Sequence, residues 1–165
     1  MLADSPGSKI GAMPARLVAR FLHSVQRLRW RFFRPLTVGV RLLAVENGKV
    51  LLIRHTYLEG WYLPGGGVQT GETLPDAMRR EAAEEAGAVL HELKLFGVYS
   101  SFFEGKSDHI VVFVSEDFTW RRTASREVEN VDSFSVDGLP EATSPGTRRR
   151  IAEFAAGARN VSAPW

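Results

Sequence analysis

The segment from Gly66 to Ala88 constrains the fold of this chain more than any other part of the sequence. It begins as a glycine-rich loop and continues into a predicted helix that carries Glu81, Glu84 and Glu85 at i, i+3 and i+4. Residues at that spacing lie on one face of an α-helix, so three like charges are predicted to converge. Mg²⁺ and Mn²⁺ prefer such carboxylate oxygens. A bound cation therefore gives a reason for an otherwise repulsive spacing.

The predicted helix within this segment has clear end signals. Thr73 is a candidate N-cap with Asp76 three residues later, and Pro75 occupies the first turn, where a missing N–H does no harm. Gly87 suits the left-handed position that commonly follows a helix. These signals predict a short helix bounded by the glycine-rich loop and by Gly87.

Length and the absence of cysteine limit the class of protein. A chain of 165 residues suits one domain with its own core. With no cysteine, disulfides, thiolate nucleophiles and cysteine zinc sites are excluded. The composition fits a reducing compartment, so we predict a cytoplasmic protein. No apolar run approaches the roughly 20 residues that a membrane-spanning helix needs.

Charge is divided unevenly along the chain. Residues 1–35 carry seven Lys or Arg against one Asp, whereas the remaining residues carry 14 Lys or Arg against 18 Asp or Glu. The body is therefore mildly acidic, and the basic pI is no reason to expect a specific nucleic acid partner for it. Residues 1–13 are small and polar, and we predict them to be disordered.

Residues 14–35 are predicted to form a basic amphipathic helix or arm that Pro35 ends. The favoured interpretation is a helix docked on the domain or on a partner protein. Contact of residues 14–34 with an anionic membrane or with nucleic acid is one alternative, and a targeting sequence is another. The apolar positions at helical spacing are Leu17, Phe21, Val25 and Leu28, with Arg16, Arg20 and Arg27 elsewhere around the helix.

The rest of the chain is predicted to alternate strands and helices. Leu36–Val45 and Val50–Arg54 are rich in β-branched and aliphatic residues, and Asn47-Gly48 between them is a strong hairpin signal. The order hairpin, helix, hairpin, strand, helix predicts an α/β sandwich with a mixed sheet. The later predicted strands are Trp61–Leu63, Leu93–Phe103, His109–Glu116 and one within Glu127–Val136, and a closing helix is predicted over Thr147–Ala156 with Ile151 and Phe154 inward.

The segment resembles the Nudix box of Nudix hydrolases: Gly, five residues, Glu, seven residues, Arg-Glu, an apolar residue, any residue, Glu-Glu, any residue, Gly and an apolar residue. At roughly 7% usage per residue type, seven fixed positions match by chance about once in 10⁸ alignments. The similarity extends over about residues 36–160, which we predict to be the Nudix domain. The box positions are filled by Gly66, Glu72, Arg80, Glu81, Ala82, Glu84, Glu85, Gly87 and Ala88.

This resemblance implies a Nudix α/β/α sandwich and hydrolysis of a nucleoside diphosphate linked to another group X, with Mg²⁺ or Mn²⁺ as cofactor. The metal ligands implied are Glu81, Glu84 and Glu85, with the carbonyl of Gly66. Glu81 or Glu84 is the candidate general base, and Arg80 is expected to hold a carboxylate in place. Glu127 is the candidate catalytic glutamate from a later loop, with Glu129 as the fallback. Glu72 is expected to brace the loop against the helix.

The substrate is less constrained by the sequence. The proline that would indicate ADP-ribose is absent from Phe102-Phe103-Glu104, and the other specialised markers are absent or incomplete, so we predict a (deoxy)nucleoside triphosphate or related nucleotide. Arg41 is a second candidate for phosphate, and His55 and His109 are interpreted as structural or substrate-side. The candidate substrate-binding residues are Arg54, Tyr57, Trp61, Tyr62, Gly65, Gly66, Gly67 and Phe102, with Phe103 as a further stacking candidate.

A second function class stays open at this point. The chain could be a non-catalytic, nucleotide-sensing or regulatory Nudix domain that reaches a partner protein through its basic helix. Such domains often lose box acids, and this chain keeps all of them, which favours the enzyme. A homodimer is compatible with either function.

Overall fold

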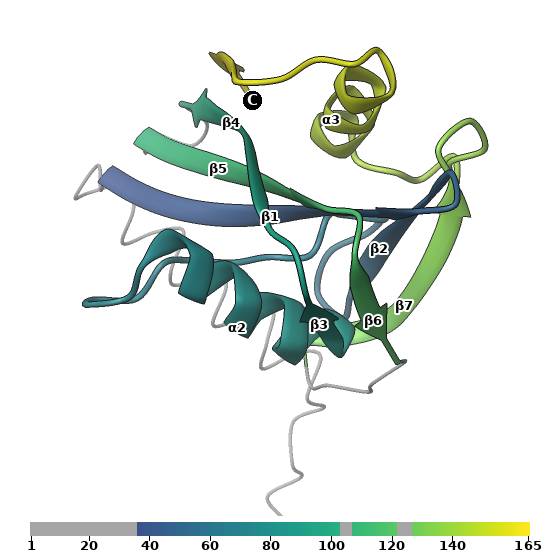
Figure 1. Cartoon of the computed structure of the whole chain (residues 1–165), viewed down its shortest axis with the longest axis horizontal. Coiled ribbons are helices and arrows are strands. Elements are labelled where there is room, and N and C mark those ends of the chain that lie inside the picture. Colours follow the sequence, from purple (N-terminus) through teal and green to yellow (C-terminus); the bar gives the residue numbers. More distant parts are fainter. Residues whose placement is uncertain (1–35, 103–106, 122–126) are drawn as a thin grey trace, which may run out of the picture.

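A computed structural model of the chain describes residues 36–102, 107–121 and 127–165. Figure 1 shows a twisted sheet between two helices, α2 (Leu74–Ala86) and α3 (Pro145–Ala155). The predictions made for residues 1–13, for the basic helix over 14–35 and for Phe103 lie outside the described residues. Within those residues, no helix is long and apolar enough to cross a membrane.

The first two strands form the predicted hairpin. β1 (Leu36–Glu46) and β2 (Lys49–His55) pair antiparallel near the turn. Asn47 and Gly48 both have positive φ angles, 51° and 70°. A two-residue turn with two positive φ angles follows the right-handed twist of the strands, which is why Asn-Gly is favoured there.

The main sheet has six strands in the order β7-β2-β1-β5-β4-β8. β1 runs parallel to β5, β4 runs parallel to β8, and the other neighbours are antiparallel, so the sheet is mixed as predicted. The remaining strands of this sheet are β4 (Lys94–Ser101), β5 (Ser107–Ser115), β7 (Val128–Ser135) and β8 (Val161–Pro164).

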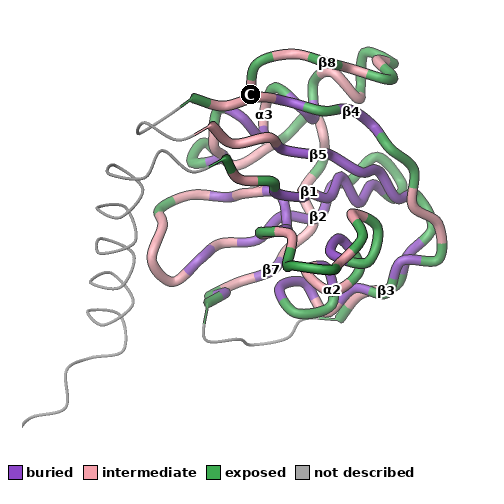
Figure 2. Tube along the Cα trace, turned by 90° about the vertical axis from the view of Figure 1, so that its left-hand side faces the viewer, coloured by how far each residue is buried: buried purple, intermediate pink, exposed green. Residues whose placement is uncertain are grey.

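Two helices cover opposite faces of this sheet. α2 (Leu74–Ala86) packs on one cluster of buried side chains and α3 (Pro145–Ala155) on the other. Alternate residues of β1 supply both clusters, with Val40 on the α2 side and Leu43 on the α3 side, because successive side chains of a strand point to opposite faces. Figure 2 shows burial concentrated in the central strands and on the inner sides of the helices. This arrangement confirms the predicted α/β/α sandwich.

Both helices begin at a capping side chain. The hydroxyl of Thr73 accepts from the N–H of Asp76 at 3.3 Å, and Gly87 ends α2 in the left-handed conformation with φ 59° and ψ 29°. α3 begins two residues before the predicted start, because Ser144 caps it by accepting from the N–H of Thr147 at 3.3 Å. The ends predicted for α2 are therefore confirmed.

Three short strands were missed by the sequence patterns. β3 (Ala88–Leu90) and β6 (Phe118–Trp120) pair in a small second sheet, and β8 pairs with β4 at the edge of the main sheet. Three or four residues are too few to show a period of two. In place of the strand predicted at Trp61–Leu63, the structure has two isolated β-bridges, one between Tyr62 and Ile53 and one between Trp61 and Thr143.

The C-terminal residues pack over the α3 side of the sheet. The backbone N–H of Trp165 donates to the carbonyl of Ser100 at 2.9 Å. Arg150 of α3 is buried, with its guanidinium 3.9 Å from the ring centre of Tyr99 and 5.3 Å from that of Trp165. Glu153 accepts from both Arg150 and Tyr99, at 2.7 and 2.8 Å. The end of the chain is thus part of the folded core.

Candidate active site

The candidate site begins where β1 and β2 separate. They pair only next to the turn, and the segment from Trp61 to Val68 fills the space between them farther on. Tyr62 exchanges two 2.9 Å backbone hydrogen bonds with Ile53 of β2, and the carbonyl of Gly66 accepts from Val40 of β1 at 2.9 Å. The glycine loop is therefore held like an extra strand inside the sheet.

Two glycines allow close approaches in this loop. Gly65 has a φ of 137°, and a side chain there would collide with the carbonyl of Val40. A side chain at Gly66 would collide with the carboxylate of Glu81. The carboxylate of Glu81 thus lies directly against the loop backbone, and a side chain at Gly66 would displace it.

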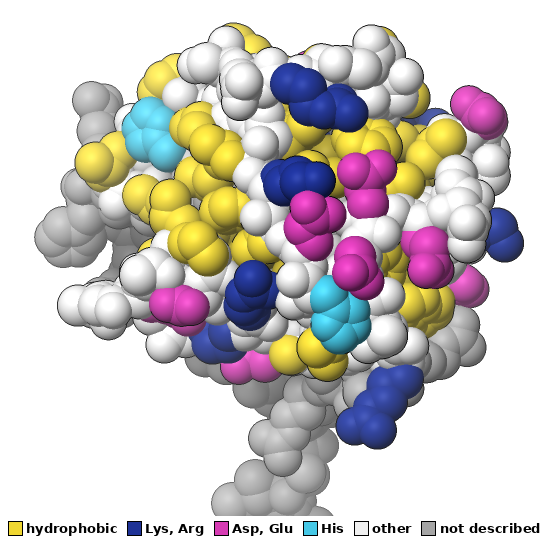
Figure 3. All heavy atoms as spheres, viewed as in Figure 1, with side chains coloured by type: hydrophobic (Ala, Val, Ile, Leu, Met, Phe, Trp, Pro, Cys, Tyr) yellow, Lys and Arg dark blue, Asp and Glu magenta, His cyan; other side chains and the backbone are white. Residues whose placement is uncertain are grey.

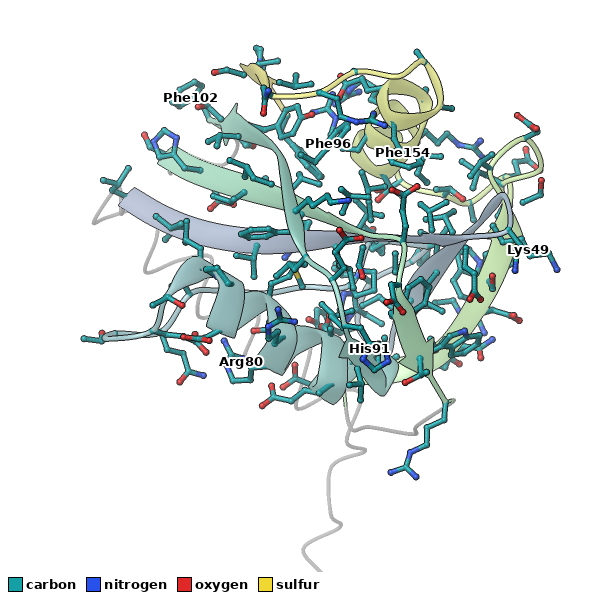
Figure 4. All side chains as sticks on the ribbon, viewed as in Figure 1. Lys49, Arg80, His91, Phe96, Phe102 and Phe154 are labelled. Atoms are coloured by element: carbon teal, nitrogen blue, oxygen red, sulfur yellow. The ribbon has the colours of Figure 1, made fainter. Side chains whose placement is uncertain are left out.

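Arg80 gathers the acids on the outer side of α2, where Figure 4 labels it. It makes a forked contact with Glu72, from Nε to Oε1 at 2.8 Å and from Nη2 to Oε2 at 3.0 Å. Its Nη1 donates to Glu81 at 2.7 Å and to Glu84 at 3.3 Å, and its Nη2 donates to the carbonyl of Gly67 at 3.0 Å. The hydrogen bond from Arg80 also lowers the pKa of Glu72. This arrangement agrees with the expected brace between loop and helix.

Glu85 points to the opposite side, into the protein. Its Oε2 accepts from the N–H of Gly65 at 2.6 Å, and the residue is 8% exposed. Burial raises the pKa of Glu85 to about 7, with the Gly65 N–H and the charge of Arg41 opposing that rise and Glu81 and Glu127 adding to it. A buried carboxylate with so little compensation is well suited to binding a cation.

The predicted convergence of the three helix acids is therefore only partly correct. The side chain of Glu84 is 60% exposed, whereas those of Glu81 and Glu85 are 12% and 11% exposed. Adjacent residues of a helix lie about 100° apart around its axis, so Glu84 and Glu85 cannot both face the loop. Glu81 and Glu85 form the inner part of the site, and Glu84 lies at its rim.

His55 lies beside Glu85 at the end of β2. Its Nδ1 is 3.9 Å from Oε1 of Glu85, and its ring is stacked on Tyr57 at 5.0 Å and tilted against Tyr62 at 5.8 Å. Burial, and next the charge of Arg41, lower the pKa of His55 to about 4, while the carbonyl of Glu127 opposes the shift. The ring is therefore neutral at physiological pH.

Tyr57 and Glu127 lie close to the same acids. Burial raises the pKa of Tyr57 to about 12, and the charges of Glu127 and Glu85 add to that rise. The carbonyl of Glu127 accepts from the N–H of Thr56 at 2.9 Å, which holds the segment before β7 against the end of β2. The glutamate predicted from a later loop is thus near the box acids.

Two predicted substrate-binding residues lie elsewhere. Trp61 is buried in the cluster on the α3 side, with its ring 4.7 Å from Phe134. Arg54 lies 5.5 Å from the centre of the Trp61 ring, and its Nε is 3.3 Å from Glu129. Both residues are therefore on the other side of the sheet from Glu85, and they are engaged in packing and in an ion pair.

Phe102 lies at an exposed apolar end of the sheet, with 72% of the residue exposed. Leu36 and Val38 of β1 and Val98 of β4 are also exposed there, and Figure 3 shows hydrophobic side chains gathered at that end. Cross-strand partners share a face, so the pairing places Val38, His109 and Ser100 together on the α2 side. Ser100 and His109 are hydrogen-bonded at 3.1 Å.

The apolar end adjoins the glycine loop. The N–H of Val68 donates to the carbonyl of Val38 at 3.0 Å, and Gly67 forms an isolated antiparallel β-bridge with Gly39. A ligand that reaches from the loop along β1 would therefore meet Val38, Leu36 and Phe102. Sequence reasoning missed Leu36 and Val38. An aliphatic strand residue that extends beyond the helices and is exposed has the same sequence pattern as one that a helix covers.

The donor set fits a divalent cation in its chemistry. Glu81 and Glu85 are acids held against a loop backbone, and carboxylate oxygens are the ligands that such a cation prefers. The carbonyl of Gly66 already accepts from Val40, which leaves it one lone pair. Within the part of the chain that the structure describes, no three His, Asp or Glu side chains are already arranged around one point. Glu81 and Glu84 would therefore exchange contacts with Arg80 for contacts with the cation.

Comparison with known proteins gives a consistent result. The NUDIX domain family matches residues 33–154. An ADP-ribose pyrophosphatase of Methanocaldococcus jannaschii is 30% identical over 118 residues, which cover 68% of this chain and 70% of that protein. An RNA pyrophosphohydrolase of Xanthomonas campestris is 42% identical over 65 residues, which cover 39% of this chain and only 31% of that protein.

Solved structures share the fold. A MutT NUDIX hydrolase from Burkholderia pseudomallei superposes with a TM-score of 0.65 at 27% identity, over 72% of this chain and 97% of that one. A MutT protein from Bacillus halodurans superposes with a TM-score of 0.65 at 20% identity, over 76% of this chain and 86% of that one, and shows likeness in fold alone.

Proposed function

The chain belongs to the Nudix hydrolase family, and on that premise we propose that it is a divalent-metal-dependent pyrophosphohydrolase of a (deoxy)nucleoside triphosphate or a related nucleotide. The observation that carries the proposal is the position of the complete box. Its loop is held in the sheet next to β1, and Glu81 and Glu85 lie directly against the loop glycines. The phosphates would lie where the acids and the loop meet.

Glu81, Glu84 and Glu85, with the carbonyl of Gly66, would hold the cation. When bound, it neutralises charge on the phosphate oxygens and lowers the pKa of an attacking water. Other residues of the chain hold these acids in position. Arg80 restrains Glu81 and Glu84 from outside, and Gly65 fixes one oxygen of Glu85. Glu81, Glu84 and Glu127 are the candidates to take the proton from the water.

The nucleoside is proposed to lie on the exposed apolar end of the sheet. Phe102 offers an open aromatic face there, and Leu36 and Val38 offer aliphatic contact next to the glycine loop. The hydrogen-bonded pair of Ser100 and His109 supplies polar groups on the same face. Stacking of a base on an aromatic ring is worth about 1–3 kcal/mol, which makes this surface adequate for a nucleotide.

ADP-ribose is a second candidate substrate, because a relative that covers most of the domain is named an ADP-ribose pyrophosphatase. A 5′-triphosphorylated RNA end is less supported, because the match to the RNA pyrophosphohydrolases spans 31% of their length. Each of these compounds contains a nucleoside diphosphate linked to another group, and all of them belong in one assay.

The test is a product analysis with a mixed panel. The protein is incubated with Mg²⁺ and nucleoside triphosphates, ADP-ribose, dinucleotides and a short triphosphorylated RNA, and products are identified by mass spectrometry. We expect hydrolysis within a diphosphate bridge of at least one nucleotide, and its dependence on the metal is checked with a chelator. Nucleotide binding without any turnover would instead support the non-catalytic sensor. Turnover that survives the chelator would contradict the metal dependence.

A further inference from the structure

His109 and Ser100 form a polar pair within the exposed apolar end of the sheet. The Nδ1 of His109 and the hydroxyl oxygen of Ser100 are 3.1 Å apart. In the part of the chain that the structure describes, Nε2 of His109 has no hydrogen-bond partner, and it is not one of the buried polar atoms that lack one. Nε2 therefore reaches the surface, where it is open to a ligand.

The pair lies on the same face of the sheet as the apolar residues around it. Val38 of β1 pairs with His109 of β5, which pairs in turn with Ser100 of β4, and cross-strand partners share a face. Two residues after His109, Val111 belongs to the buried cluster beneath α2, and its partner Val98 is 39% exposed. The polar pair is therefore on the α2 side of the sheet, among exposed aliphatic side chains and just beyond the part that α2 covers.

The distance from this pair to the glycine loop suits a nucleotide. Val68 at the end of the loop lies opposite Val38, and His109 follows on the next strand. Two strand spacings and two residues along a strand separate His109 from Gly66, which is roughly 12 Å. A ribose and its phosphates bridge such a distance when the phosphates lie against the box acids.

The apolar surface around the pair favours a large base. Leu36 and Phe102 are 71% and 72% exposed, and Val38 is 40% exposed. The free energy gained by burial grows with the apolar area that is covered. The two fused rings of a purine therefore gain more on this surface than the single ring of a pyrimidine.

The hydroxyl of Ser100 makes the pair adaptable. An uncharged imidazole has one donor and one acceptor nitrogen, and a serine hydroxyl donates or accepts by rotating. Where the hydroxyl donates to Nδ1, Nε2 carries the proton and donates to an oxo group. Where the hydroxyl accepts from Nδ1–H, Nε2 accepts from an amino group. Adenine has an amino group at C6 and guanine an oxo group, so the same pair satisfies both bases.

We propose that His109 and Ser100 recognise the C6 substituent of a purine nucleotide, with adenine and guanine accepted alike and pyrimidines bound less tightly. The inference rests on the location of the nucleoside in the proposed function and names the class of base, which the Nudix box does not determine. His109 contacts the base, whereas Ser100 acts through His109 and is a positioning residue.

Nucleoside monophosphates test this recognition without turnover, because they contain no phosphoanhydride bond. The ligands are AMP, GMP, CMP, UMP and purine riboside 5′-monophosphate, which lacks a C6 substituent, and each Kd is measured by NMR titration of ¹⁵N-labelled protein. The variants are His109→Phe, which keeps a flat ring without nitrogen, and Ser100→Ala. His91→Phe serves as the control, because His91 is exposed beside β3 and lies outside the site (Figure 4).

We expect AMP and GMP to bind the unchanged protein with similar Kd values and more tightly than CMP or UMP. Each should bind about 2–10-fold more tightly than purine riboside 5′-monophosphate, which is the effect of one added hydrogen bond. His109→Phe should remove the difference between AMP and purine riboside 5′-monophosphate, and Ser100→Ala should reduce it. His91→Phe should leave the difference unchanged.

The proposal is overturned if His109→Phe keeps the preference for AMP over purine riboside 5′-monophosphate, if pyrimidines bind more tightly, or if no monophosphate binds. A strong preference between AMP and GMP would contradict the adaptable pair. An equal loss of affinity for every ligand in His109→Phe would assign only packing to that residue.

Where His109→Phe does not fold, the preferences of the unchanged protein and their reduction in Ser100→Ala decide the question. Failure of the proposed function gives a different result, because the unchanged protein then shows the base preference but hydrolyses no nucleotide of the panel. Hydrolysis without the base preference would instead overturn this inference and leave the proposed function in place.

Discussion

The carboxylate of Glu85 accepts a 2.6 Å hydrogen bond from the backbone N–H of Gly65, 20 residues earlier in the chain. This contact joins the end of the glycine loop to the inner side of α2. The position of Glu85 therefore depends on the backbone conformation of Gly65. The fold and the site therefore depend on the same few loop residues.

Gly65→Ala should damage both the fold and the activity. With φ at 137° a side chain is strained, and its Cβ would collide with the carbonyl of Val40. Strain of this kind costs about 1–3 kcal/mol, so urea denaturation should show a loss of unfolding free energy of at least that size. Gly67→Ala is the matched control, because no atom lies within 4 Å of the Cβ it would add. We expect its stability to change by less than about 0.5 kcal/mol. Similar losses in the two variants would contradict this account.

The box acids should be needed for turnover and not for folding. Glu84→Gln and Glu85→Gln are each expected to lower kcat by roughly 10²–10⁴-fold while circular dichroism stays unchanged. Their structural settings differ, since Glu84 is at the exposed rim and Glu85 is buried. Full activity in either variant would remove that acid from the mechanism.

Arg80→Lys tests whether the forked contact matters in addition to the charge. Lysine keeps the charge and cannot make two parallel hydrogen bonds to Glu72 while reaching Glu81. We expect kcat to fall about 10–100-fold, since residues that orient metal ligands have effects of that size. Arg79→Lys is the control on the neighbouring position, where the guanidinium donates to the carbonyl of Leu90 outside the site. Equal activities of Arg80→Lys and the unchanged enzyme would show that charge alone suffices.

Phe102 and Trp61 should respond differently to replacement, although both were predicted from sequence as base-stacking residues. Phe102→Ala removes an exposed ring and should raise KM roughly 5–150-fold with little change in thermal stability. Trp61→Phe leaves a cavity beside Phe134 and should lower the melting temperature with KM nearly unchanged. Steady-state kinetics and thermal unfolding of both variants provide the check. The reverse pattern would place the nucleoside on the α3 side of the sheet.

The sequence was sufficient where the information is local. Turn chemistry at Asn47-Gly48 and the caps of α2 depend on neighbouring residues, and the structure has both as predicted. The direction in which each acidic side chain points could not be predicted as well from the sequence. Spacing placed Glu84 and Glu85 on the same helix, but Arg80 and Gly65 pull them to different sides, and those contacts span the loop.

Long-range packing accounts for the other differences. β8 is recognisable only through its pairing with β4, which is distant in the chain. Trp61 is an aromatic residue of the kind that stacks on ligands, and only its packing against Phe134 shows that it belongs to the core.

The pair formed by Tyr99 and Glu153 predicts a loss of stability in alkali. Burial, and next the hydrogen bond to Glu153 at 2.8 Å, raise the pKa of Tyr99 well above its ordinary value near 10. The neutral phenol is favoured in the folded state, so its contribution is complete below about pH 10 and declines as the pH rises toward the folded-state pKa, because only the unfolded chain then ionises. At pH 11 this residue alone should have lowered the unfolding free energy by about 1 kcal/mol relative to pH 9. Urea denaturation at the two pH values measures the change.

Tyr99→Phe separates this contribution from the other groups that titrate in alkali. It should lose about 1 kcal/mol at pH 8, where the hydrogen bond to Glu153 is removed. Between pH 9 and 11 its unfolding free energy should then fall by about 1 kcal/mol less than that of the unchanged protein. Parallel declines in the two proteins would mean that the Tyr99 hydroxyl titrates alike in the folded and unfolded states, against the burial and hydrogen bonding that the structure gives it.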